Sequence, residues 1–72
     1  MYLIRYRSAS EGKWVTLAKA LVKTEDEAFQ FAIMRIRERY CMWELTLPRY
    51  AAHIWLVCSC GTPMGFVKIT HH

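Results

Sequence analysis

The segment Thr24-Glu25-Asp26-Glu27 begins the only long helix that this 72-residue chain encodes. The Thr24 hydroxyl can accept a hydrogen bond from the Glu27 amide, and the Glu27 carboxylate can reach back to the Thr24 amide. Acidic residues in the first turn and three arginines toward the other end suit the two ends of the helix dipole. We therefore predict a helix from Glu25 to Tyr40.

One stripe of this predicted helix is apolar and faces the rest of the protein. At about 100° per residue, the stripe contains Phe29, Ala32, Ile33, Ile36 and Tyr40, with Ala28 at its border. Phe31 and Met34 fall outside the stripe, where a solvated helix normally carries polar side chains. They are therefore candidate contact residues. The alternative is that a neighbouring segment of the chain covers them.

Short strands are predicted for the rest of the chain. Residues 2–7 alternate, with Tyr2, Ile4 and Tyr6 on one face and Leu3, Arg5 and Arg7 on the other. A second strand is predicted over 14–23, and because both of its faces are fairly apolar, we place it centrally in the sheet. Further strands are predicted over 43–47, 53–60 and 66–70, with a connection at 49–52 and a five-residue turn at 61–65.

This order of elements predicts an α+β fold, with a small antiparallel sheet in the order ββαβββ and one helix packed on one face. A chain of 72 residues has a single core, so residues 1–72 form one domain. The hydrophobic fraction of 54% argues against disorder. It also leaves apolar residues at the surface, where contiguous patches are typical of contact sites. We expect a monomer that binds a partner.

The apolar runs and the cysteines limit the other classes. The longest apolar run, Ile54 to Cys58, is much shorter than the roughly 18 residues that cross a bilayer, and we recognise no leader peptide, so we expect a cytoplasmic protein. An odd number of cysteines favours reduced thiols. Cys58 and Cys60 would project to the same side of a strand, but this spacing fits a zinc site poorly even with the other candidate ligands Cys41, His53, His71 and His72. We predict no metal and no other cofactor.

No catalytic group is recognisable in the sequence. No serine has a motif context, and no glycine-rich loop for binding phosphate is present. Glu38 and Glu44 are the only acids outside the helix start and the first turn, which leaves no carboxylate pair for acid–base chemistry. We predict that the protein is not an enzyme.

The charge leaves nucleic-acid binding open. Ten basic and six acidic residues give a net charge of +4. A basic sheet that carries Arg5 and Arg7 beside exposed aromatic rings could hold a single strand by stacking. Arg35 and Arg39 also have a structural reason to lie at the C-terminal end of a helix. The same arginines would suit an acidic protein surface equally well.

A family resemblance points to a protein partner. Residues 20–28, with the sequence ALVKTEDEA, lead from a strand into the helix, and the helix is followed by Trp43-Glu44-Leu45-Thr46. This pattern resembles the small early phage proteins that bind and inhibit bacterial RNA polymerase, and the length and single-helix layout are similar to transcription regulators of Xanthomonas phages. The likeness covers Trp14 to Leu47.

This resemblance implies a non-enzymatic inhibitor in the cytoplasm of a bacterial host. Such a protein docks on the β′ or β subunit of RNA polymerase, displaces sigma or blocks promoter complexes, and in some members promotes read-through of terminators. The podophage inhibitor carries an acidic strip, whereas this chain is net basic. We therefore expect contact through basic, aromatic and apolar side chains, namely Arg5, Tyr6, Arg7, Phe31, Met34, Arg35 and Arg39. Two alternatives stay open: an anti-CRISPR or other anti-defence protein that occludes a surface, and a small nucleic-acid-binding module.

Overall fold

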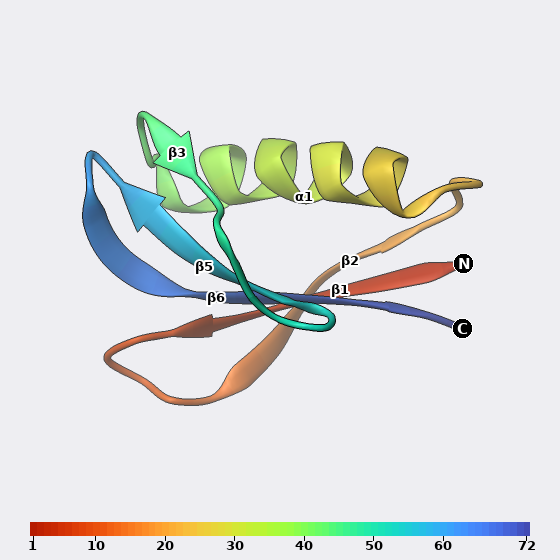
Figure 1. Cartoon of the computed structure of the whole chain (residues 1–72), viewed down its shortest axis with the longest axis horizontal. Helices are drawn as coiled ribbons and strands as arrows, with labels where there is room; N and C mark the ends of the chain where they lie inside the picture. Colours follow the sequence, from red (N-terminus) through yellow and green to blue (C-terminus); the bar gives the residue numbers. More distant parts are fainter.

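In the computed structural model, which describes all 72 residues, one helix lies across one face of a six-stranded antiparallel sheet (Figure 1). In chain order the elements are β1 (Tyr2–Ser8), β2 (Trp14–Ala20), α1 (Glu25–Tyr40), β3 (Leu45–Thr46), β4 (Arg49–Ala51), β5 (Ile54–Ser59) and β6 (Thr62–His71). The strand order is β2-β1-β6-β5-β3, and β4 also pairs with β5. The predicted α+β class is confirmed. The predicted order ββαβββ is one strand short.

The core lies between α1 and the sheet. The largest fully buried side chains come from three strands and the helix: Ile4, Ile36, Val57, Val67 and Ile69. Ala28 and Ala32 are also fully buried, and their small side chains let the helix approach the sheet closely. Larger side chains therefore flank this line of contact. Phe29 packs against the core, with its ring 5.4 Å from that of Trp55.

The predicted helix bounds are confirmed, and the capping differs in one detail. Thr24 has an extended backbone, and its hydroxyl accepts from the Glu27 amide at 3.2 Å. The Glu27 carboxylate accepts from the Thr24 hydroxyl at 3.2 Å, in place of the backbone amide that we expected. At the other end, Cys41 adopts a left-handed conformation, and its amide donates to the Arg37 carbonyl at 3.0 Å.

Phe31 was predicted to lie outside the buried stripe, but it packs partly against the core. The buried centre of the helix is Ala28, Ala32 and Ile36, which brings Phe31 to one border of the contact with the sheet. Met34 is 57% exposed. Of the two residues predicted to lie outside the stripe, only Met34 is open to solvent.

The predictions for β2 were wrong in two respects. The strand ends at Ala20 and not at Lys23, and Leu21 beyond it is 88% exposed. Strand β2 also lies at an edge of the sheet, whereas we predicted a central position. The pairing with β1 shifts between Ile4 and Arg5, which skips Leu17 and forms a bulge. Leu17 and Ala18 both pack at the core, so the bulge is the reason that apolar residues occupy both phases of this strand.

The β5–β6 hairpin is confirmed, but its turn is shorter than predicted. Cys60 and Gly61 form the connection with positive φ values of 51° and 79°, and β6 begins at Thr62. The predicted strand over 43–47 shrinks to Leu45–Thr46, because Glu44 also has a positive φ of 49°. The 49–52 connection contains the short strand β4. It pairs with Ile54 and Trp55 at the start of β5, whereas β3 pairs with Cys58 and Ser59 at the end of β5.

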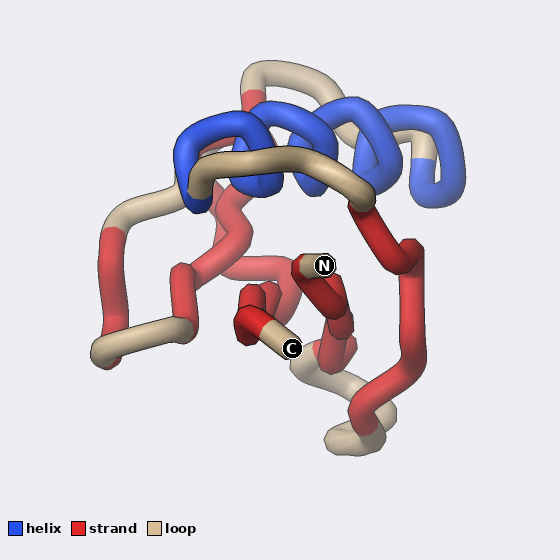
Figure 2. The backbone as a smooth tube through the Cα atoms, turned by 90° about the vertical axis from the view of Figure 1, so that its right-hand side faces the viewer, coloured by secondary structure: helices blue, strands red, loops and turns tan.

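The two ends of the chain meet on neighbouring strands (Figure 2). The Met1 amino group donates to the His72 carbonyl at 3.2 Å, and the His72 amide donates to the Met1 carbonyl at 2.7 Å. His71 belongs to β6, and its ring lies 4.7 Å from that of Tyr2. None of this chain's helical structure has the length and apolar character that crossing a membrane requires.

Candidate binding surface

The face of the sheet that α1 does not cover is called here the open face (Figure 2). It is formed by the strand residues that alternate with the buried ones on β2, β1, β6 and β5. The strand register sets them in three rows: Trp14, Arg7, Phe66 and Leu56; Thr16, Arg5, Lys68 and Ile54; and Lys19, Leu3 and Thr70. Side chains that follow each other in a row are cross-strand neighbours.

The open face carries positive charge without negative charge. Its basic residues are Arg5, Arg7, Lys19 and Lys68. No strand contains an acidic residue: Glu11 lies in the loop between β1 and β2, and all others lie in α1 or between α1 and β3. The net charge of +4 is therefore unevenly distributed over the molecule.

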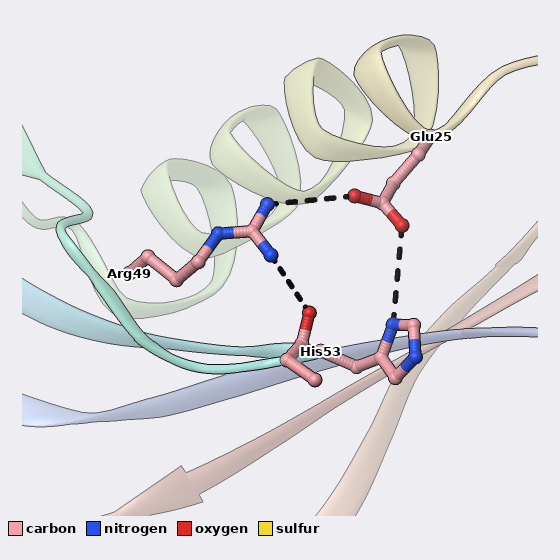
Figure 3. A network of polar contacts seen from close by, with 4 residues as sticks. Glu25, Arg49 and His53 are labelled. Atoms are coloured by element: carbon pink, nitrogen blue, oxygen red, sulfur yellow. Dashed lines mark hydrogen bonds and ion pairs between the residues drawn. The ribbon is translucent and has the colours of Figure 1, made fainter.

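The cations of the open face have no ion-pair partner within the chain. The Glu25 carboxylate is engaged on the helix side, 3.8 Å from an Arg49 nitrogen and 3.9 Å from His53 Nδ1 (Figure 3). The remaining ion pair joins Arg35 and Glu38 on α1. Arg5 lies directly opposite Lys68, an arrangement of like charges that destabilises a sheet. The fold thus leaves positive charge uncompensated, which favours an anionic partner.

Aromatic rings lie among these cations. The Arg7 guanidinium is 5.3 Å from the ring centroids of both Trp14 and Phe66, and Lys68 Nζ is 5.7 Å from the Trp14 ring. Tyr50 on β4 meets Phe66 edge-on, with ring centroids 4.9 Å apart. We call Trp14, Phe66 and Tyr50 the aromatic row, and Arg5 and Lys68 the basic row. Cation–π attraction offsets part of the repulsion between the cations.

The predicted contact residues are divided between two surfaces and the core. Arg5 and Arg7 lie on the open face, as their alternation predicts. The same alternation turns Tyr6 inward, where it is 2% exposed and its hydroxyl donates to the Met64 carbonyl at 3.2 Å, so the side chain is not available to a partner. The other predicted contacts belong to the helix on the opposite side: Phe31, Met34, Arg35 and Arg39.

The helix residues form a second, smaller surface. We call Phe31, Met34, Arg35 and Glu38 the helix patch. They line a hollow of about 170 Å³, and the Arg35 guanidinium lies 5.4 Å from the Phe31 ring and 3.6 Å from the Glu38 carboxylate. A neighbouring hollow of about 210 Å³ adds Arg39 and Leu17 of β2. Phe31, Met34 and Arg35 are of the residue types that are enriched at protein contacts.

Lys68, Trp14, Phe66 and Tyr50 were missed as site residues. A signal for two of them was present, because the alternation of residues 66–70 sets Phe66 and Lys68 on the same face. The absence of acids from every predicted strand except 43–47 was a second signal. The proximity of Trp14 to Phe66 could not be predicted from the sequence, because it depends on β1 lying between β2 and β6.

The cysteines do not face the same way, contrary to the sequence prediction. Cys58 is buried at the sheet, whereas Cys60 lies exposed in the turn with a positive φ. Cys41 is exposed at the end of α1. No group of three or more histidine, cysteine, aspartate or glutamate side chains is placed to hold a metal ion.

A comparison of this chain with protein-family models, curated proteins and solved structures found no match. What the open face and the helix patch can bind is set by their charge, their side chains and their shape.

Proposed function

We propose that this protein is a non-enzymatic binding protein that holds nucleic acid on its open face. The observation that supports the proposal most is the group of basic side chains without any acidic neighbour, which includes the Arg5 and Lys68 pair of like charges. Phosphates of a nucleic acid would compensate this charge, and binding would release condensed counterions. Affinity gained in this way is strong at low salt and falls as salt rises.

The spread of the charge favours nucleic acid over a single acidic group. The cations lie on three adjacent strands, β2, β1 and β6, and in all three rows of the open face. A repeating chain of phosphates matches a spread of this kind, whereas one carboxylate would compensate only one position. Aromatic rings between the cations add contacts to bases or sugars.

The test measures binding of a labelled oligonucleotide by fluorescence anisotropy at several salt concentrations. Arg5→Gln and Lys68→Gln should each reduce the slope of log K against log salt by roughly 0.7 to 0.9, the value for one phosphate contact. Lys23→Gln is the matched control, because Lys23 is exposed between β2 and α1 and lies outside the open face. Lack of binding, or an equal effect of Lys23→Gln, would contradict the proposal.

The helix patch favours a second candidate function, contact with a protein. Met34 is 57% exposed beside Phe31, and nucleic-acid binding on the open face leaves both unused. Together with the resemblance to phage inhibitors, this supports occlusion of a surface on the β′ or β subunit of bacterial RNA polymerase. The arginines of the patch would then contact acidic groups of the polymerase.

Purified bacterial RNA polymerase, with and without sigma, provides the test. The tagged protein should retain the polymerase, and Met34→Asp or Arg35→Glu should reduce retention while Arg5→Gln does not. Circular dichroism of each variant checks that α1 is intact. If no polymerase is retained, or if only the open-face variant loses it, the second candidate is wrong.

A further inference from the structure

We infer that the nucleic acid held by the open face is single-stranded, with its bases stacked on the aromatic row and its phosphates along the basic row. The inference rests on the proposed nucleic-acid function and adds the class of strand and its path over the surface. It follows from the width of the sheet, the spacing of the two rows and the free donors of the arginines.

The width of the sheet disfavours a duplex. Five strands lie side by side in the order β2-β1-β6-β5-β3. At about 4.8 Å between strands the sheet is about 19 Å wide, whereas the major groove of B-DNA is about 12 Å wide. The helix, which would fit a groove, lies on the other face (Figure 1). A duplex could therefore offer this face only its phosphates, and its base faces would stay covered.

The spacing of the two rows suits one strand. Phe66 and Lys68 are two residues apart on β6, as Arg7 and Arg5 are on β1, so the rows run parallel about 7 Å apart. Trp14 and Phe66 lie two strands apart, about 10 Å, with Arg7 between them. A single strand that crosses the sheet from β2 toward β4 would thus place bases over the rings and its backbone over the cations.

The cations along this path have no polar partner within the chain, although Arg7 and Lys68 lie over rings of the aromatic row. Within the chain, Arg5, Arg7 and Lys68 make no side-chain hydrogen bond and no ion pair. Their N–H groups are therefore available to phosphate oxygens. Tyr50 is 67% exposed at the end of the row, which leaves a ring face for stacking. Stacking needs no particular base, so the site should tolerate different sequences.

Three labelled probes with equal numbers of phosphates test the inference: oligo-dT, a hairpin duplex and an abasic strand. Because each stacked base adds roughly 5-fold to 150-fold in affinity, oligo-dT should bind at least about 5-fold more tightly than the other two. Phe66→Leu and Tyr50→Leu should each weaken oligo-dT binding by about 5-fold or more with an unchanged salt slope. Tyr50→Leu changes an exposed ring, so its result does not depend on the core.

Trp43→Leu is the matched control, because Trp43 is 75% exposed but lies between α1 and β3 and belongs to none of the three rows of the open face. An equal loss with Trp43→Leu would overturn the inference. Equal affinity for the three probes, or tighter binding of the duplex, would also overturn it while leaving nucleic-acid binding in place. Binding to none of the probes would remove the proposed function itself.

Discussion

At the scale of a single residue, the buried Tyr6 makes the stability of the protein depend on pH. Burial, followed by the nearby Tyr40 and Glu11, raises the pKa of its hydroxyl above the ordinary value of 10.0. The unfolded chain therefore releases this proton at a lower pH than the folded protein does. The resulting stability is fully present below about pH 10 and is lost as the pH rises through the folded pKa.

Tyr6→Phe should make the protein less sensitive to alkaline pH. At neutral pH the loss of one hydrogen bond should cost about 0.5 to 1 kcal/mol, because the Met64 carbonyl keeps its bond from the Ala9 amide at 3.0 Å. Between about pH 9 and about pH 11, the free energy of unfolding, measured with urea, should fall less in the variant than in the parent protein. The exposed Tyr50→Phe should behave like the parent, and an equal alkaline loss in Tyr6→Phe would contradict the assignment.

Gly65 is needed because β1 and β6 approach each other closely. A Cβ added at this buried position would meet the Arg7 carbonyl oxygen and would lie 2.7 Å from the Tyr6 hydroxyl. Gly65→Ala should therefore destabilise the protein by about 3 kcal/mol, the upper end for overpacking, because a backbone oxygen cannot rotate away. Thermal unfolding measures the effect. In a Tyr6→Phe background most of the loss should remain, and a full rescue would show that the hydroxyl, not the backbone, is the obstacle.

Thr24 sets the start of α1, and its contribution belongs to the scale of the element. Thr24→Ala removes the acceptor of the Glu27 amide and should cost about 1 kcal/mol. For a domain of this size, that loss corresponds to a fall in melting temperature of roughly 4–8 °C. Thr24→Ser should keep the parent value, because a serine hydroxyl also accepts from the Glu27 amide and donates to the Glu27 carboxylate. A fall of the same size in Thr24→Ser would show that the cap is not the cause.

Elements with local signals were predictable, and elements that depend on distant pairing were not. The bounds of α1 follow from the capping residue at one end and the order of charges, all within the helix itself. The end of β2 depends on a bulge that forms only against β1. The two-residue turn at Cys60 was missed because it uses a positive φ at a residue that rarely adopts one.

The candidate site divides in the same way. Arg5 and Arg7 were predicted, because period-two alternation within β1 is enough to set them on one face. The like-charge contact between Arg5 and Lys68 was not, because it joins the first strand of the chain to the last. Tyr6 was predicted as a contact residue because it is aromatic, although the alternation that exposes its neighbours buries it.

Net charge is unevenly distributed over the whole molecule. The open face carries only cations, whereas five of the six acids lie in α1 or between α1 and β3, where the three arginines of α1 offset most of their charge. This uneven distribution gives the molecule an electric dipole moment, which would orient the open face toward a polyanion during diffusion and raise the association rate. It also has a cost, because Arg5 and Lys68 repel each other in the absence of a partner.

Lys68→Glu should therefore stabilise the free protein while it weakens binding. The new carboxylate would face Arg5 across β1 and β6, and a favourable cross-strand pair contributes roughly 0.2 to 1 kcal/mol. The gain should be largest at about 0.01 M salt and small at about 1 M, where the Debye length falls from about 30 Å to about 3 Å. Urea unfolding at both salt concentrations measures this gain in stability, with Lys68→Gln as the control that removes the repulsion without adding a pair.

In the oligonucleotide titration of Lys68→Glu, the salt slope should fall by more than the roughly 0.7 to 0.9 lost with one phosphate contact. If Lys68→Glu is less stable than Lys68→Gln at low salt, the Arg5–Lys68 repulsion does not destabilise the free protein. If Lys68→Glu binds nucleic acid as the parent does, Lys68 does not contribute to binding.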